Sequence, residues 1–150
     1  MLNKIVKLKN FNIANNKPII LIAGPCQLED DEHPMKIASM LKDITSRLSI
    51  NFIFKSSFDK ANRTSLNSKR GVGLKKSLDI FENIKKKLDV PILTDVHTQE
   101  QCKEVSQIVD IIQIPAFLCR QTDLLVSAAK TKKIINVKKG QFLAPWDMVN

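Results

Sequence analysis

The sequence has no tyrosine, one tryptophan and only four glycines. Aromatic residues make up 5% of it, which leaves little material for the stacking platforms that bind single-stranded nucleic acids. The glycines are Gly24, Gly71, Gly73 and Gly140, and their spacing matches neither GxGxxG nor the Walker A loop. An open sheet that binds a nucleotide through such a loop is therefore disfavoured.

Long apolar runs and cysteine pairs are also missing. No apolar run approaches the ~20 residues that span a bilayer, and the run at 18–23 is too short for the core of a signal peptide. The cysteines, Cys26, Cys102 and Cys119, are odd in number and form no CxxC pair. That pattern suits a reducing compartment, so we expect a cytoplasmic protein without a membrane partner.

Positive charge is abundant, with 24 Lys and Arg against 15 Asp and Glu and a formal net charge of +9. A basic balance is the first sign of a nucleic-acid binder. The lysines are nevertheless spread along the chain, and several mark the solvated face of one helix. Attraction of small anionic substrates accounts for the charge equally well, and we expect no nucleic-acid partner.

The hydrophobic pattern alternates between strands and helices. Residues 5–13 predict a small hairpin. Residues 1–17, which include this hairpin, are assigned to an N-terminal cap of the barrel. The continuous apolar run at 18–23 is typical of a strand buried on both faces. Further strands are predicted at 51–54, 91–95, 110–114 and 134–138. Helices are predicted at 34–48, at 74–88, at 122–130, and from two starting points, Thr98 and Pro145. In the first of them Ile37, Leu41, Ile44 and Leu48 are expected to face inward. Thr98 and Gln101 form the capping box that opens the helix after Thr98.

Strict strand–helix alternation indicates an α/β fold with a parallel sheet. An open doubly wound sheet and a (β/α)8 TIM barrel both satisfy it. Every predicted strand is followed by polar or reactive residues, which is how barrel active sites are assembled, whereas open sheets concentrate theirs at one switch point. We therefore expect residues 18–150 to form the first five strands of a barrel.

The most informative segment is FKSSFDKANRTS, residues 54–65. Two lysines, an asparagine, an arginine and four hydroxyl residues occur there without any apolar period. Cations and hydroxyls of this kind suit a phosphosugar or a phosphocarboxylate. The alternative is a solvated basic loop, and the chemistry at the other strand ends favours the functional interpretation.

Five motifs together resemble the 3-deoxy-D-manno-octulosonate 8-phosphate synthases: IAGPCQLED, FKSSFDKANRTSLNSKRGVG, TDVH, QIPAFLCRQTDL and INVKKGQFLAPWDM. The resemblance implies condensation of phosphoenolpyruvate with D-arabinose 5-phosphate, release of inorganic phosphate, a role in lipopolysaccharide synthesis, and a tetramer of TIM barrels. The sister synthases of 3-deoxy-heptulosonate 7-phosphate, which use erythrose 4-phosphate, typically have Lys-Pro-Arg-Thr-Ser in the loop. Ala61 and Asn62 match the octulosonate enzymes instead, and the sister activity stays the alternative.

The resemblance also implies substrate contacts. Lys60 and Lys138 match lysines that bind phosphoenolpyruvate, and Lys55 is a third cation at the end of an apolar run. Asn62, Arg63 and Thr64 match the arabinose-phosphate loop. Gln113 lies beside a turn at which the backbone N–H of Ala116 meets a phosphate, and Arg120 is expected to reach a neighbouring subunit.

Three residues are assigned to chemistry by the same resemblance. Asp95 and His97 match residues near the metal and its water, where His97 suits proton transfer; alternatively, both only orient their neighbours. Cys26 matches the cysteine of members that require a divalent metal of the zinc, iron or manganese type, whereas metal-independent members carry asparagine. The alternative for Cys26 is a small buried thiol, which is what we expect of Cys102.

The length sets a further expectation, because a full barrel takes ~250 residues. We expect the N-terminal portion of a synthase, with the other metal ligands (a His, a Glu and an Asp) and a phosphate-binding arginine beyond residue 150. The chain alone is then expected to be inactive, and a non-enzymatic fragment is the remaining alternative.

Overall fold

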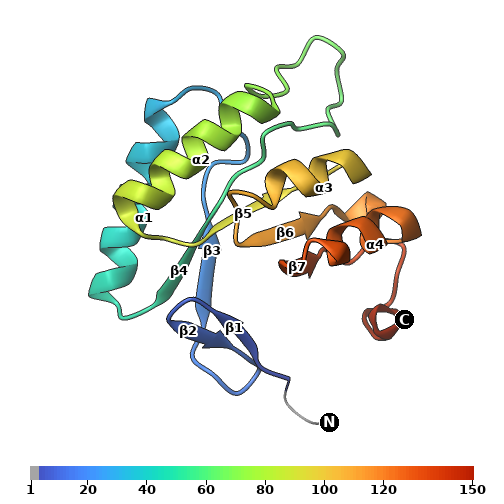
Figure 1. Ribbon diagram of the computed structural model, residues 1–150, viewed down its shortest axis with the longest axis horizontal. Helices are drawn as coiled ribbons and strands as arrows, with labels where there is room; N and C mark the ends of the chain where they lie inside the picture. Colours follow the sequence, from blue (N-terminus) through green and yellow to red (C-terminus); the bar gives the residue numbers. More distant parts are fainter. Residues whose placement is uncertain (1–3) are drawn as a thin grey trace.

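A computed structural model of the chain describes residues 4–150. Its sheet has five parallel strands in sequence order, as predicted: β3 (Ile20–Ala23), β4 (Asn51–Lys55), β5 (Ile92–Asp95), β6 (Ile111–Ile114) and β7 (Ile134–Val137). Between them run α1 (Glu32–Arg47), α2 (Leu74–Leu88), α3 (Gln99–Val105) and α4 (Thr122–Lys130). The sheet curls, with α1 beside α2 and α3 beside α4 along its outer side (Figure 1). This is the strand order and curvature of a partial (β/α)8 barrel.

The predicted N-terminal hairpin is confirmed. β1 (Val6–Leu8) pairs antiparallel with β2 (Phe11–Ile13), and the first three residues of the predicted 1–17 cap lie outside the described part. Figure 1 shows the hairpin at the end of the sheet opposite the long loop that precedes α2. Leu8 is buried there against inward-facing side chains of the sheet, namely Ile53, Leu93 and Ile111. The hairpin therefore covers the amino-terminal end of the inner face.

Strand alternation gives the sheet two different faces. The outer face packs against the helices through a continuous apolar core that includes Phe52, Phe54, Ile92, Ile112 and Ile114. The inner face carries Ile53, Leu93 and Ile111 under the hairpin. Two residues further along each strand, the same face carries Lys55, Asp95 and Gln113. The polar layer thus lies directly above an apolar layer that anchors it.

The prediction that the first strand is buried on both faces is wrong. Ile19 is 77% exposed and Ile22 45% exposed, because β3 forms an edge of the sheet and pairs only with β4. The predicted inward face of α1 is also partly wrong. Ile44 and Leu48 are exposed, whereas Ala38 and Thr45 are buried. α1 packs against β4 and α2 on one side, so only part of its apolar surface is covered.

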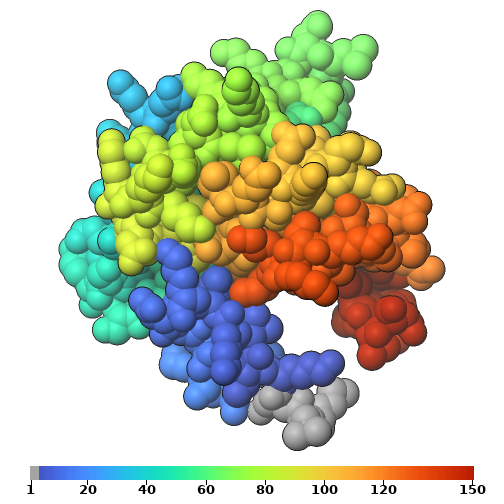
Figure 2. All heavy atoms as spheres, viewed as in Figure 1, coloured from blue at the N-terminus to red at the C-terminus, as the bar shows by residue number. Residues whose placement is uncertain are grey.

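The other predicted elements agree with the structure. The Gln101 carboxamide oxygen accepts the N–H of Thr98 at 3.2 Å, which completes the predicted capping box at the start of α3, and Cys102 is fully buried in the core. A short 3₁₀ helix, Pro145–Val149, ends the chain. In Figure 2 an open notch separates this end from the hairpin. Within residues 4–150 no helix combines the length and apolarity needed to cross a bilayer.

Candidate active site

The carboxyl ends of β3 and β4 are tied together by backbone contacts. A side chain at Gly24 would run into the Lys55 carbonyl and lie 3.1 Å from the Phe54 ring, so glycine permits this close approach. Beyond it, Leu28 N–H donates to the Ser57 carbonyl at 2.9 Å and Ser57 N–H to the Cys26 carbonyl at 3.3 Å. Cys26 is therefore positioned by pairing with the extension of β4.

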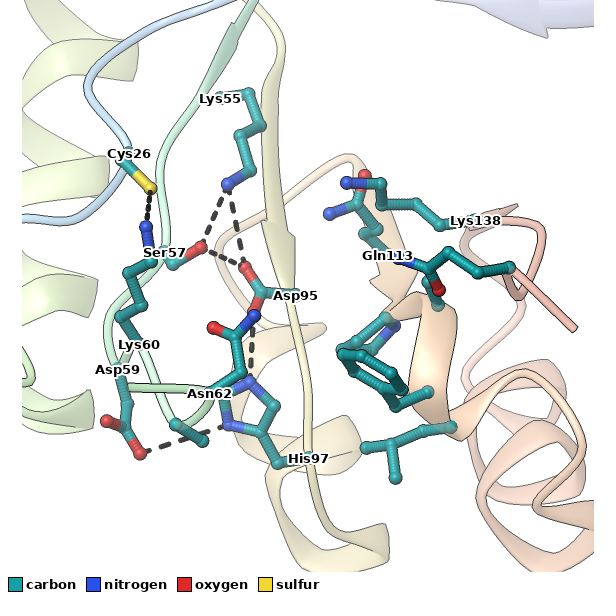
Figure 3. A pocket seen from close by; sticks show the side chains of 16 residues that line it. Cys26, Lys55, Ser57, Asp59, Lys60, Asn62, Asp95, His97, Gln113 and Lys138 are labelled. Carbon is teal, nitrogen blue, oxygen red and sulfur yellow. Dashed lines mark hydrogen bonds and ion pairs between the residues drawn. The ribbon is translucent and has the colours of Figure 1, made fainter. Parts of the chain in front are cut away.

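A line of polar side chains crosses from β4 to the end of β5 (Figure 3). Lys55 Nζ donates to Ser57 Oγ at 2.9 Å, and Ser57 Oγ donates to a carboxylate oxygen of Asp95. Lys55 Nζ also lies 3.9 Å from Asp95 Oδ1. The other Asp95 oxygen contacts His97 Nε2 at 2.9 Å. The network holds a cation, a carboxylate and an imidazole in fixed relation.

Burial and charge act in opposite directions on this network. Burial would raise the pKa of Asp95, but hydrogen bonds from His97 and Ser57 and the charge of Lys55 outweigh it and leave that pKa lowered. Burial lowers the pKa of Lys55, while Asp95 and Cys26 oppose the shift and Lys138 and Lys60 add to it. Burial thus sets the direction of the Lys55 shift, whereas partners set the direction of the Asp95 shift.

The opposite wall of the site comes from β6 and β7. Asn136 donates its side-chain amide to Gln113 Oε1 at 2.9 Å across the paired strands. Lys138 follows β7, and its backbone N–H donates to the Ile114 carbonyl at 3.0 Å. Beyond β6, Pro115 leads into the 3₁₀ turn Ala116–Leu118. Figure 3 shows Gln113 and Lys138 across an open space from Lys55 and Asp95.

These walls enclose a pocket of about 550 Å³. It brings together most of the predicted site residues: Cys26, Lys55, Lys60, Asn62, Asp95, His97, Gln113, Ala116 and Lys138. Three others do not line it. Arg63 donates to Gln27 Oε1 at 2.5 Å and to the Lys69 carbonyl at 3.0 Å, and Thr64 is exposed in the same loop. Arg120 borders a neighbouring hollow that also touches His97.

The model of the DAHP synthetase I family matches residues 3–150. The chain belongs to the DAHP synthetase I family. It is 57% identical over 148 residues to a protein of Brucella anthropi and equally to one of Brucella ovis, both named 2-dehydro-3-deoxyphosphooctonate aldolase. Each match covers 99% of this chain and 53% of the relative. The chain therefore spans about half the length of these curated relatives.

Sequence reasoning missed some of the residues that build this pocket. Ser57 bridges Lys55 and Asp95, and Asp59 lines the pocket below His97. Gln27 accepts from Arg63 and donates to Glu29 at 3.0 Å. Ser57 had a usable signal, since it follows Lys55 by two positions and so continues the inner face of β4. Asp59 and Gln27 lie in irregular loops, where no periodicity marks them.

A metal centre is not built by the described residues alone. Cys26 is exposed and its Sγ accepts a hydrogen bond from Lys60 Nζ at 2.8 Å, so its sulfur already contacts an ammonium group. Within residues 4–150 no group of three His, Cys, Asp or Glu side chains could hold a metal ion. For this member of the DAHP synthetase I family, Cys26 is thus a single soft donor rather than a site.

Proposed function

We propose that the chain carries the phosphoenolpyruvate side of a 3-deoxy-D-manno-octulosonate 8-phosphate synthase. The observation that carries the proposal is the convergence of Lys55, Lys60 and Lys138 on one pocket that also contains Asp95 and His97. Phosphoenolpyruvate bears a phosphate ester and a carboxylate on the same carbon, and several cations within one pocket suit that charge. Relatives at 57% identity are named for the octulosonate product, which supports the choice of reaction.

The proposed reaction forms one carbon–carbon bond and one carbon–oxygen bond. C3 of phosphoenolpyruvate attacks the aldehyde carbon of D-arabinose 5-phosphate, and the aldehyde oxygen gains a proton. A water oxygen adds to C2, and one water proton balances the proton gained by the aldehyde oxygen. The bond between C2 and the bridging oxygen then breaks, C2 becomes a ketone carbonyl, and inorganic phosphate leaves with the second water proton. Lys60 and Lys138 bind the phosphate and carboxylate, while Lys55 stabilises negative charge as that bond breaks.

Asp95 and His97 are proposed to orient and exchange the protons of this reaction. Their contact at 2.9 Å fixes the imidazole, and the lowered pKa of Asp95 keeps its carboxylate charged. A charged carboxylate favours a proton on His97 Nε2. That arrangement suits an imidazole that holds or passes a proton at the aldehyde or water.

The sugar phosphate is assigned to the segment after Lys60. Asn62 lines the pocket and offers an amide to sugar hydroxyls; Arg63 and Thr64 follow it outside the pocket lining and are proposed to bind the phosphate of the sugar. Gln113 and the N–H of Ala116 bound the opposite wall. The competing substrate is erythrose 4-phosphate, because the matching family model is named for the heptulosonate synthases.

Further parts of the proposal concern groups outside the chain. Cys26 would supply one thiolate to a divalent metal of the zinc, iron or manganese type, the other ligands coming from outside residues 4–150, and Lys60 would have to leave its sulfur. A metal there would act as a Lewis acid. Arg120 is proposed to face a neighbouring subunit of a cytoplasmic tetramer. The chain alone is proposed to be inactive.

The test uses a hybrid in which this chain replaces the matching segment of the Brucella anthropi relative. Phosphate release from phosphoenolpyruvate is measured with arabinose 5-phosphate and, in parallel, with erythrose 4-phosphate. We expect turnover with the five-carbon sugar only, and none by the chain alone. A folded hybrid that releases no phosphate with either sugar, beside an active parent, would refute the proposal. Preference for erythrose 4-phosphate would assign the sister reaction instead.

A further inference from the structure

The long segment between β4 and α2 carries Lys60, Asn62 and Arg63 but has no helix or strand of its own. Residues 61–67 are exposed, so packing does not fix their positions. A substrate-binding lysine is effective only if its ammonium group is positioned before the ligand arrives, because ordering it on binding costs free energy. Lys60 is half-buried at the start of this exposed stretch, and its ammonium group donates to Cys26 Sγ at 2.8 Å, so its backbone needs an anchor at the base of the segment.

The two ends of this segment are fastened to each other. Arg70 donates from Nε to Asp59 Oδ1 at 2.8 Å and from Nη2 to Asp59 Oδ2 at 2.5 Å, a bidentate ion pair. The backbone N–H of Lys60 donates to the Arg70 carbonyl at 2.7 Å. Gly71 has a φ of +122°, and a side chain there would lie 2.5 Å from the Phe58 carbonyl. Entry and exit thus touch through backbone and side chains.

The same carboxylate also faces the site. Asp59 Oδ2 lies 4.0 Å from His97 Nδ1, and the Phe58 ring lies 5.5 Å from the imidazole, centre to centre. Figure 3 shows the Asp59 carboxylate beside the His97 ring, joined to it by a dashed line. The Asp59 side chain is only 22% exposed although Arg70 is 60% exposed. The ion pair therefore joins a solvent-facing guanidinium to the inner part of the site.

We propose that Asp59 and Arg70 are positioning residues that hold Lys60 in place for phosphoenolpyruvate. Neither needs to touch substrate: the bidentate pair closes the segment at its base, and the Lys60 backbone is fixed to the Arg70 carbonyl at the same point. This inference rests on the proposed function for the identity of the ligand, but the closure of the segment does not depend on it. The expected consequence is weaker substrate binding with unchanged chemistry.

Exchange at the Lys60 amide tests the closure. Asp59→Asn removes the ion pair without a change in size, and Arg70→Gln removes it by deleting the guanidinium group. Arg47→Gln is the matched control, because its pair with Asp43, at 2.9 Å, lies on the exposed face of α1. Hydrogen exchange of the Lys60 N–H should be about tenfold faster in the first two variants and unchanged in the control. An unchanged rate in Asp59→Asn would overturn the proposal.

Kinetics of the hybrid test the consequence. Asp59→Asn and Arg70→Gln should each raise KM for phosphoenolpyruvate about three- to tenfold and leave kcat within about twofold. The double variant should cost no more than either single one, because both remove the same pair. Asp59→Glu, which keeps a carboxylate, should recover most of the affinity.

The outcomes separate this proposal from the proposed function. A fall in kcat with KM unchanged would overturn the positioning role and assign Asp59 an action through His97. A wild-type hybrid that releases no phosphate would refute the proposed function, and the exchange rate at Lys60 would then decide the closure by itself. Additive losses in the double variant would also overturn the pairing.

Discussion

Replacing Asp95 with asparagine is the sharpest test of the network at the centre of the pocket. The carboxylate accepts from Ser57 and contacts His97 Nε2 at 2.9 Å, with Lys55 Nζ 3.9 Å away. Hydrogen bonds to charged groups contribute about 1.5–3 kcal/mol each, whereas burial of the charge opposes them. The amide keeps one acceptor and loses the charge. We therefore expect Asp95→Asn to lower the free energy of unfolding by about 2–3 kcal/mol.

The direction of the Asp95 pKa shift determines how the free energy of unfolding should depend on pH. Because the pKa of Asp95 is lowered in the folded state, its carboxylate contributes stability above its unfolded pKa of about 3.9. That contribution is lost as pH falls through the folded pKa. In Asp95→Asn the acid side of the stability profile should be flatter. The pKa of Lys55, lowered mainly by burial, should fall further once the opposing charge of Asp95 is gone.

The measurement is urea unfolding of the hybrid from pH 3 to pH 8, roughly the range around the unfolded carboxylate pKa. Asp43→Asn is the control, because its side chain is 68% exposed beside Arg47 and should change stability by no more than about 0.5 kcal/mol. Equal midpoints for Asp95→Asn and wild type, or equally steep acid limbs, would refute the account of the network.

Three further changes test separate parts of the structure. Lys55→Met should change the free energy of unfolding by less than about 1 kcal/mol, because the cost of burying the charge disappears together with its attraction to Asp95. The same variant should bind phosphoenolpyruvate at least about tenfold more weakly, as measured by calorimetry. Phe81→Ala, at a fully buried core position, should cost about 3–5 kcal/mol in chemical unfolding, and a loss below about 1 kcal/mol would contradict the packing. Because β3 is an edge strand that pairs only with β4, we expect the chain to self-associate in sedimentation through β3. Ile22→Lys, on this edge strand, should reduce that association, because charge on an edge opposes strand pairing; unchanged association would exclude β3 as the contact.

The order of elements was predictable because the two hydrophobic periods are clear along the chain. Apolar runs alternate with helical spacing, and both predict the observed parallel sheet. The burial of β3 was not predictable, because a run such as 18–23 shows that a strand tolerates burial but not which elements cover it. The predicted burial of Ile44 and Leu48 was wrong for the same reason, since periodicity identifies an apolar helix face without identifying what packs against it.

Most pocket residues were predictable from their place after apolar strands, and the resemblance named the same positions. The period of two along each strand could also have placed three polar side chains on one face of the sheet. Each follows an inner-face apolar residue by two positions: Lys55, Asp95 and Gln113. Asp59 could not be found in this way, because its role depends on contacts with Arg70 and His97 across the fold. Arg63 shows the reverse, since its residue type predicts a phosphate ligand but its side chain is engaged by Gln27 and Lys69.

The excess of positive charge has different consequences at the surface and in the pocket. Most lysines are solvated, but burial and the nearby charges of Lys138 and Lys60 lower the pKa of Lys55, so its charged form opposes folding. Asp95 and Cys26 offset that cost only in part, because burial and the two lysines outweigh them. An anion placed between the lysines would remove the same repulsion, and its attraction to the lysines would strengthen as water leaves the pocket. The charge arrangement that costs the free chain stability is therefore the one that would favour a phosphate-bearing ligand over a neutral one.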